Sequence, residues 1–374
     1  MFKNKSRNII IFSCVFILVF STWGAGFSNL HAEENLEEYF TGELQAHYID
    51  VGQGDCILIK AISEDERYKM LIDAGQEWMG RDEVVPYLES LEIETIHIAV
   101  ATHPHADHIG GFIEIFDKFT VEKVIDSGYE HDTQTYQNYI DSIKQNEIRM
   151  VEGRSGMEKS LTEGLKFEII HPYEPLTDDI HYENIVGQMR YNEIGFLFTG
   201  DLEQKGEAAI LEKDYDIENE ILKVGHHGSE TSTTEKFLQA VEPEVSVIQV
   251  GTDNRYGHPA EKVINRLVEK DIEIYRTDYQ GNIVISTDGE NYEISEEPFD
   301  SDLDFTEEPE KLININTADN ETLQEITGVG PAIAENIIDY REKYGSFQAI
   351  EEIKNVSGIG EARFEGMADE IKIQ

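Results

Sequence analysis

Short apolar runs alternate with amphipathic stretches between residues 44 and 294. The apolar runs have the length and the β-branched content of strands, and they lie at 44–51, 56–60, 70–73, 96–102, 167–170, 196–199, 221–224, 245–250 and 283–286. Apolar positions at helical spacing predict helices over 83–91, 133–145, 204–213, 233–241 and 260–270. Because strands and helices interleave throughout, the pattern predicts an α/β fold.

The first residues have a different pattern. Three basic residues precede an apolar stretch at 9–20, and small and polar residues follow up to Ala32. This is typical of an export signal, so we predict a signal peptide over 1–32 and an exposed segment over 33–43. An uncleaved membrane anchor is the alternative, because apolar character continues past residue 20. Either way we expect a secreted protein or one on the outer face of the cytoplasmic membrane.

A second change in pattern divides the rest of the chain. Residues 296–310 hold eight acidic residues, two prolines and no basic residue, which predicts an extended linker over 296–311. The linker separates a large unit at 44–295 from a small unit of short helices at 312–374. In the small unit the pairs Gly328/Gly330 and Gly358/Gly360 each precede a helical run, which indicates an internal duplication.

Charge and cysteine content narrow the possible partners and stabilising bonds. The formal net charge is −46, and such a surface disfavours non-specific attraction to polyanions and to anionic membranes. The unit at 312–374 has five basic residues against twelve acidic ones. Without the predicted signal the chain keeps only Cys56, so it forms no internal disulfide and depends on its core and on bound metal.

Candidate chemistry is concentrated in the segment His103-Pro104-His105-Ala106-Asp107-His108, directly after an apolar run. Four metal-binding side chains in six residues predict two neighbouring cations, and two cations that share a water are typical of a hydrolase. Further polar motifs follow other apolar runs. These motifs are LIDAG at 71–75, FTGD at 198–201, KVGHHGS at 223–229 and NRYGHP at 254–259.

The order of these motifs, together with THPHADHIGG at 102–111, resembles the metallo-β-lactamase fold, and in particular the metal-dependent domain of ComEC-type DNA-uptake proteins. The resemblance covers about residues 44–290. It implies a four-layer αββα sandwich in which the ligands emerge from loops at one shared edge of two sheets. It also implies two divalent metal ions, Zn or Mn, as cofactors.

The resemblance assigns His103 and His105 to the first ion, Asp107 and His108 to the second, and Asp201 to a bridge between them. We prefer His227 as a further metal ligand, with His226 or His258 as an outer contact, a proton donor or a phosphate contact. Asp73 is expected to orient the histidine loop through hydrogen bonds.

One expected ligand differs from the family pattern. Many relatives have a histidine before the TGD strand, where this chain has Asn184. An amide oxygen is a weaker and harder ligand than imidazole, so we expect a looser first ion that also accepts Mn²⁺. His171 and His181 are alternatives for this position, although their spacing to Asp201 is less natural.

The small unit resembles the tandem helix-hairpin-helix domain of ComEA-type DNA receptors, through ININTAD at 313–319, LQEITGVGPAIAENII at 323–338, YREKYGSF at 340–347 and IKNVSGIGEARFEGM at 353–367. Glycine hairpins of this kind expose backbone N–H groups to a phosphate. The predicted DNA contacts are Gly328, Gly330, Gly358, Gly360 and Arg363. Because the unit is acidic, we expect weak, salt-dependent DNA binding, and a spacer or protein-docking role is the alternative.

Together these features predict an exported, metal-dependent phosphodiesterase or nuclease that acts on extracellular DNA. The alternatives are a non-catalytic DNA-binding or docking protein of a DNA-uptake apparatus, and a metallo-hydrolase of small molecules. No long apolar segment follows residue 32, so we do not expect this chain itself to carry DNA across a membrane.

Overall fold

The computed structural model describes residues 43–373, apart from 63–66, 163–164, 214, 253, 300–312, 319, 325, 348, 361–362, 365–366 and 368–370. The predicted signal, most of the segment at 33–43 and most of the linker lie outside the described residues. No helix in the described ranges has the length and apolar character needed to span a membrane.

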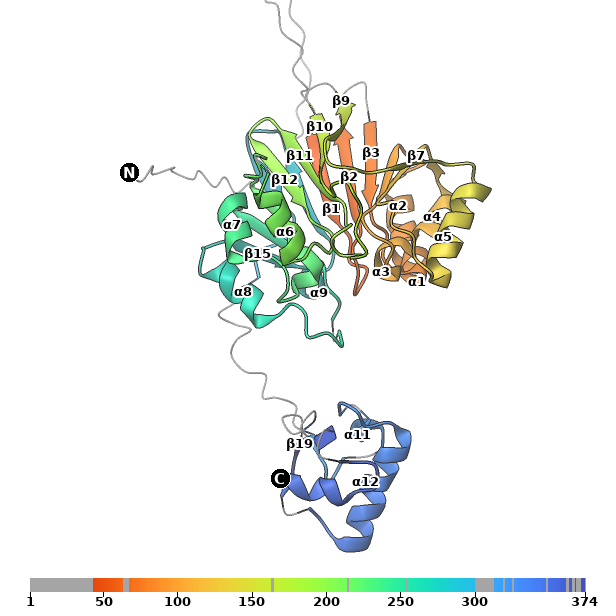
Figure 1. Cartoon of the computed structure of the whole chain (residues 1–374), viewed down its shortest axis with the longest axis vertical. Coiled ribbons are helices and arrows are strands. Elements are labelled where there is room, and N and C mark those ends of the chain that lie inside the picture. The colour runs from red at the N-terminus through yellow and green to blue at the C-terminus, as the bar shows by residue number, and fades with distance from the viewer. Residues whose placement is uncertain are drawn as a thin grey trace, which may run out of the picture. The chain divides into compact units, whose positions relative to one another are not determined.

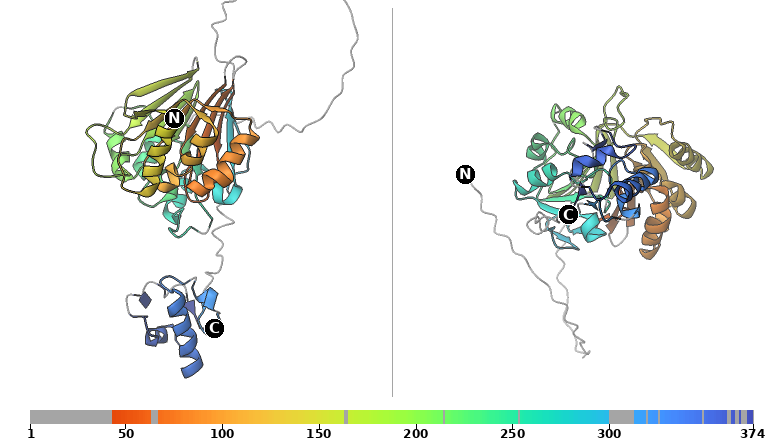
Figure 2. Two further views of the ribbon diagram at one scale, coloured as in Figure 1. Left: turned by 90° about the vertical axis from the view of Figure 1, so that its right-hand side faces the viewer. Right: turned by 90° about the horizontal axis from the view of Figure 1, so that it is seen from below.

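Residues 43–299 form two sheets that pack face to face, with helices on both outer faces (Figures 1 and 2). The structure therefore confirms the predicted four-layer αββα arrangement. One apolar core lies between the sheets and includes Tyr48, Phe167 and Phe196. A second core lies beneath the first group of helices, around Phe112 and Tyr139. A third lies beneath the other helices, around Phe237 and Leu267.

The first sheet is mixed, and its strands run in the order β17-β16-β1-β2-β3-β5-β7-β8. Strands β3, β5, β7 and β8 are parallel. The bounds are β1 Glu43–Tyr48, β2 Ile57–Ile62, β3 Arg67–Ile72, β5 Ile98–Ala101, β7 Lys123–Asp126, β8 Arg149–Glu152, β16 Ile283–Thr287 and β17 Tyr292–Ile294. A separate parallel pair consists of β4 Thr95–Ile96 and β6 Thr120–Val121.

The second sheet has the order β15-β14-β13-β12-β11-β10-β9, with β12 to β15 parallel. Its bounds are β9 Met157–Thr162, β10 Leu165–His171, β11 Val186–Tyr191, β12 Ile194–Phe198, β13 Ile221–Lys223, β14 Val245–Ile248 and β15 Glu273–Arg276. The carboxyl ends of the parallel strands of both sheets lead into loops, and in α/β folds such loops carry binding sites.

Helices α2, α4 and α5 cover the first sheet, and α6, α7 and α8 cover the second (Figure 1). Side chains fix two of the helix starts, because the hydroxyls of Thr133 and Thr234 accept hydrogen bonds from backbone N–H groups in the first turns of α5 and α7. The helical bounds are α1 Glu77–Met79, η1 Gly80–Val84, α2 Val85–Ser90, α3 Ala106–Ile109, α4 Phe112–Lys118, α5 Gln134–Gln145, α6 Gln204–Leu211, η2 Gly225–Gly228, α7 Glu235–Val241, α8 Glu261–Val268 and α9 Thr277–Gln280.

The predicted linker begins too early. Phe299 is buried in the third core, and its backbone N–H donates to the carbonyl of Ile274 at 2.7 Å. The guanidinium of Arg276 lies 4.7 Å from the centre of the Phe299 ring. Residues 296–299 therefore belong to the large unit, because an aromatic side chain within an acidic stretch still gains from burial.

The small unit has its own core, which includes Ile315, Ile337, Phe347 and Ile353. Its elements are β18 Ile313–Asn314, α11 Asn320–Leu323, α12 Pro331–Tyr344, η3 Ile350–Asn355 and β19 Ile371–Lys372. Strands β18 and β19 pair in parallel and join the two ends of the unit.

Candidate metal centre

The predicted site residues lie where the parallel strands of both sheets end. Asp73 follows β3 and His103 follows β5 in the first sheet. Asp201 follows β12, and His227 lies in η2 after β13, in the second sheet. Strands of the two sheets thus bring residues from distant parts of the chain to one edge.

Asp73 holds the histidine segment in place. Its carboxylate accepts hydrogen bonds from the backbone N–H of Thr102 at 2.8 Å and from the Thr102 hydroxyl at 2.7 Å. The same carboxylate lies 2.8 Å from Nδ1 of His108. This contact fixes the ring, so that Nε2 is the nitrogen that His108 can offer to a cation.

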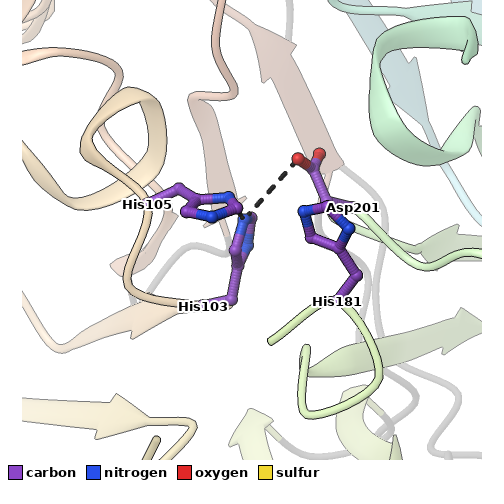
Figure 3. A group of neighbouring side chains, drawn as sticks. All are labelled: His103, His105, His181 and Asp201. Atoms are coloured by element: carbon purple, nitrogen blue, oxygen red, sulfur yellow. Dashed lines mark hydrogen bonds and ion pairs between the residues drawn. The ribbon is translucent and has the colours of Figure 1, made fainter. Parts of the chain in front are cut away.

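The first group of candidate ligands contains His103, His105, His181 and Asp201 (Figure 3). One ligand atom from each lies within 4.8 Å of the others. Nε2 of His103 is 2.8 Å from Nδ1 of His105 and 3.5 Å from Oδ2 of Asp201. His103 is fully buried, whereas His105 and His181 are partly exposed, so this group lies toward the solvent.

The second group contains Asp107, His108 and His227. Nε2 of His227 lies 3.5 Å from Oδ2 of Asp107. On the other side of the ring, Nδ1 of His227 is held by the carbonyl of Gln249 at 2.9 Å. His108 and His227 are buried, so this group lies deeper than the first.

Asp201 joins the two groups through its two carboxylate oxygens. Oδ1 lies 3.3 Å from Nε2 of His108 and 3.5 Å from Nε2 of His227. Oδ2 lies 3.5 Å from Nε2 of His103 in the other group. The carboxylate is therefore placed as a bridging ligand would be.

Unsatisfied polar atoms show that this arrangement suits cations. Nε2 of His108, Nε2 of His227 and Oδ1 of Asp201 are buried and have no hydrogen-bond partner. Leaving such atoms unpaired in a protein interior costs free energy, which a shared cation offsets. Imidazole and carboxylate are also the donors that zinc, manganese and iron take in proteins.

The pKa values separate the two groups. Burial lowers the pKa of His103 well below its ordinary value and lowers that of His105 to about 4, so both are neutral at pH 7. Burial opposes protonation of His227 as well, but the carboxylates of Asp201, Asp107 and Asp55 outweigh it and raise the pKa to about 10. At pH 7 the deeper group therefore holds a proton that balances its carboxylates, and binding of a metal ion there must release it.

Asp55 and Lys223 form a buried ion pair behind the second group that we did not assign from the sequence. Oδ1 of Asp55 lies 3.3 Å from Nδ1 of His227. Lys223 also donates to the carbonyl of Gly200 at 3.0 Å, next to Asp201. The pair therefore supports His227 and the loop that carries Asp201, both of which follow strands of the second sheet. Both residues lie in motifs of the sequence, Asp55 in GD at 54–55 and Lys223 in KVGHHGS at 223–229. A lysine at the end of an apolar strand, however, suggests a side chain exposed to solvent.

His226 and His258 lie next to the two groups. Nε2 of His226 is 3.6 Å from Oδ2 of Asp201, and its Nδ1 is 3.2 Å from Oε1 of Glu203. The rings of His226 and His258 are 5.8 Å apart. Burial lowers the pKa of both histidines. The backbone at His226 and His227 is left-handed, with φ values of 46° and 52°, a strained conformation of the kind found at functional sites.

Asn184 is placed differently from our expectation. Its amide oxygen accepts from the backbone N–H of Asp201 at 2.9 Å, and its amide nitrogen donates to the carbonyls of Thr199 and Ile185 at 2.7 and 3.1 Å. These three hydrogen bonds use both ends of the amide to hold the loop that carries Asp201. The imidazole of His181 occupies the fourth place in the first group, so a first ion would have three imidazole ligands in place of the weaker amide oxygen that we expected.

His171, the other alternative, also faces the backbone. Its Nδ1 lies 3.1 Å from the carbonyl of Asn184, and it belongs to none of the ligand groups in the described part of the chain.

The two glycine hairpins of the small unit lie close together around Arg363. Gly328 and Gly358 have left-handed φ values of 79° and 96°, as tight hairpins require. The guanidinium of Arg363 donates to the carbonyl of Gly358. A Cβ atom added to Gly328 would lie 3.5 Å from Nε of Arg363. Gly330 precedes α12, and Gly360 accepts from the backbone N–H of Arg363 at 3.1 Å.

Two family models match the chain. The metallo-beta-lactamase superfamily model matches residues 49–251, and the helix-hairpin-helix motif model matches residues 308–372. The first match covers every candidate metal ligand, and the second covers both glycine hairpins. The two resemblances that the motifs indicated are thus confirmed.

Curated relatives match the chain over either a long or a short stretch. ComE operon protein 3 of Bacillus subtilis is 29% identical over 259 residues, which are 65% of this chain and 33% of that protein. Competence protein ComA of Neisseria gonorrhoeae is 30% identical over 234 residues, 62% of this chain and 30% of that protein. ComE operon protein 1 of B. subtilis is 57% identical over 63 residues, 17% of this chain and 31% of that protein. The chain thus spans about a third of each relative.

Proposed function

Because the chain belongs to the metallo-beta-lactamase superfamily, we propose that it is an exported, metal-dependent phosphodiesterase that cleaves DNA, with a C-terminal module that holds the DNA. The observation that carries the proposal is the position of Asp201, whose two oxygens face two different sets of histidines. A purely structural metal site would need neither a shared carboxylate nor a partly exposed group of ligands.

The residues have distinct proposed roles. His103, His105, His181 and Asp201 would hold one cation, and Asp107, His108, His227 and Asp201 the other. When bound, a pair of divalent cations supplies a nucleophile from water at neutral pH and offsets the negative charge of a phosphodiester. Asp55, Asp73 and Glu203 keep the imidazoles in the orientation that this requires.

His226 and His258 are proposed to act on the substrate. Both have lowered pKa values, so each is neutral at pH 7 and can donate an N–H hydrogen bond or accept a proton. His226 lies near the bridging carboxylate, which suits a contact to the phosphate or to the departing oxygen. Asp107 is one-quarter exposed and is the carboxylate of the second group that a substrate can reach.

The DNA part of the proposal rests on the small unit and on the relatives. Two hairpins with exposed glycines offer backbone N–H groups to phosphates. Relatives that match each unit are named as competence or ComE operon proteins. The proposed location outside the cytoplasm rests on the first 32 residues, which lie outside the described part of the chain.

The test uses the chain from residue 33 onward, stripped with a chelator and reloaded with Mn²⁺ or Zn²⁺. We expect cleavage of labelled single- or double-stranded DNA by the loaded protein and none by the stripped protein. The Asp201→Asn variant is the matched control, because it keeps the size of the side chain and removes the shared charge. A folded protein that takes up two metal equivalents per chain and cleaves no DNA under any salt condition would contradict the proposal.

A hydrolase of small molecules is the second candidate, because the same centre can serve other substrates. Its supporting observation is the acidic surface, which repels DNA. A panel of phosphodiesters, thioesters and lactams separates the two candidates. If a small ester is hydrolysed several orders of magnitude faster than any DNA, the small-molecule assignment replaces the nuclease assignment.

A further inference from the structure

The loop between β14 and α8 extends from the metal centre to the surface. His258, at its inner end, lies 5.8 Å from the His226 ring, and His226 contacts Asp201. Whatever the outer end of this loop binds therefore lies next to the proposed reaction site.

The outer end of the loop presents an unusual pair of side chains. Tyr256 is 55% exposed, and its ring lies 5.8 Å from the His258 ring at an interplanar angle of 19°. The Arg255 guanidinium lies 5.0 Å from the Tyr256 ring centre and donates to the phenolic oxygen at 3.0 Å. Among the described residues, no carboxylate pairs with Arg255, although the chain is strongly acidic.

The loop is held in one shape by Asn254. The side-chain oxygen of Asn254 accepts from the backbone N–H groups of Tyr256 at 3.2 Å and His258 at 3.0 Å. Its nitrogen donates to the carbonyls of Gly251 at 3.0 Å and His258 at 2.6 Å. The aromatic ring and the guanidinium are thus presented on a fixed turn, which lowers the entropy cost of binding.

Other exposed aromatic side chains lie on nearby elements. The hydroxyl of Thr252 donates to the carbonyl of Asp278 at 3.3 Å, which ties the loop to α9, where Tyr279 is 60% exposed. Trp78, in α1, is 53% exposed. Figure 1 shows α1, α3 and α9 along the same edge of the two sheets.

We propose that Tyr256 and Arg255 form a positioning site for single-stranded nucleic acid. Tyr256 stacks on the base next to the scissile phosphate, and Arg255 binds a neighbouring phosphate. The proposal rests on the proposed function and adds that the substrate is single-stranded. Base–aromatic stacking does not need a basic surface, so it supplies binding that the acidic surface cannot. Bases in a duplex have both faces covered, so the site selects single strands.

The test measures binding and cleavage separately. An oligonucleotide with 2-aminopurine at successive positions is added to the Mn²⁺-loaded chain from residue 33 onward, and quenching of its fluorescence reports stacking. Cleavage is followed with the same oligonucleotide and with one that lacks the base at the stacking position. The variants are Tyr256→Ala, Tyr256→Trp and Arg255→Gln.

Tyr344→Ala is the matched control, since Tyr344 is also an exposed tyrosine, 64% exposed, with a cation, Lys343, over its ring at 4.9 Å. Tyr344 lies in the small unit, so the oligonucleotide is kept short enough to occupy one unit only. Its length is about four nucleotides, the smallest site that single-strand grooves span.

We expect Tyr256→Ala to abolish the quenching and to lower kcat/KM about tenfold, the size of effect that loss of one base–aromatic stack produces. Tyr256→Trp should keep the quenching and the kcat/KM, and Arg255→Gln should raise KM. Tyr344→Ala should change neither the quenching nor kcat/KM. On the strand that lacks the base at the stacking position, the Tyr256→Ala variant and the unchanged protein should have the same kcat/KM.

Each result has a separate meaning. Quenching that depends on Tyr256 without any cleavage supports the stacking site and contradicts the nuclease. Cleavage that is equal in Tyr256→Ala and the unchanged protein overturns the stacking site and leaves the nuclease standing. Neither quenching nor cleavage, in a protein that binds metal, overturns both. An equal loss on the abasic strand also overturns the stacking site, because the tyrosine would then act only on the structure of the loop.

Discussion

The metal centre of the large unit and the glycine hairpins of the small unit are both proposed to bind phosphate, but they are built in different ways. The centre uses buried and partly buried side chains from loops of both sheets, and several of these side chains have a second contact that fixes the ring. The hairpins use backbone N–H groups and one exposed cation, Arg363, in a unit with five basic and twelve acidic residues.

The difference predicts how each region responds to substitution. A buried group that compensates several charges cannot be removed without leaving others unpaired, so single changes at the centre have large effects. Backbone N–H donors remain whatever the side chain is, so single substitutions at the hairpins should have small effects. Four substitutions, in order of decreasing effect, test this contrast.

Asp201→Asn is expected to have the largest effect. It removes the charge that both ligand groups share, so kcat/KM for DNA should fall by about a thousandfold or more, as for residues that act as one unit with a catalytic centre. Metal content, measured on the purified variant, should fall below two equivalents. Unchanged metal content with full activity would show that the carboxylate does not bridge.

Lys223→Met is expected to act mainly on stability. It leaves the Asp55 carboxylate buried without its cation, and breaking a buried pair in this way costs about 3–5 kcal/mol. Urea unfolding of the metal-free protein measures the loss. The double variant Lys223→Met, Asp55→Asn should recover part of it, because no unpaired charge remains. A single variant as stable as the unchanged chain would contradict the role of the pair.

Glu203→Gln tests the contacts that orient the outer histidines. Oε1 of Glu203 lies 3.4 Å from Nδ1 of His181 and 3.2 Å from Nδ1 of His226, and it accepts from the Thr231 hydroxyl at 2.8 Å. Loss of such a contact typically lowers metal affinity or activity by about 10–100-fold. Competition with a chromophoric chelator measures the affinity. Glu230→Gln is the control, because Glu230 is exposed and, among the described residues, its ion pair is with Lys262 at the surface.

Arg363→Ala is expected to have the smallest effect. Removing one phosphate contact should weaken DNA binding uniformly across sequences and reduce the salt slope of log K by about one. Fluorescence anisotropy at several salt concentrations measures both, and circular dichroism checks that the hairpins remain folded. A slope that does not change would place Arg363 outside the DNA contact and favour the docking role for the small unit.

The fold could be predicted where strands are buried on both faces. The runs that became β5, β12 and β14 consist largely of apolar residues and are buried throughout. Strands β8 and β9 escaped prediction because they lie at the sheet edges and carry polar side chains. Strand β11 escaped because Gly187 interrupts its pattern. A Cβ atom there would lie 2.3 Å from the Phe167 ring, so packing rather than propensity places a glycine in that strand.

The candidate ligands could be predicted where they follow a regular strand. His103 and Asp201 lie within three residues of the ends of buried strands, and the strand ends fix their position. His181 lies in the irregular segment between β10 and β11, where no periodic pattern indicates the direction of a side chain. Lys223 was missed because its partner, Asp55, is far away in sequence, and only the packing of the two sheets brings the charges together.

The most direct test of the central claim is crystallographic anomalous scattering at the manganese and zinc edges, on the chain from residue 33 onward loaded with each metal. We predict two peaks on either side of Asp201. One should contact His103, His105 and His181, and the other Asp107, His108 and His227. A single peak, or peaks away from Asp201, would contradict the binuclear centre on which the proposed hydrolysis depends.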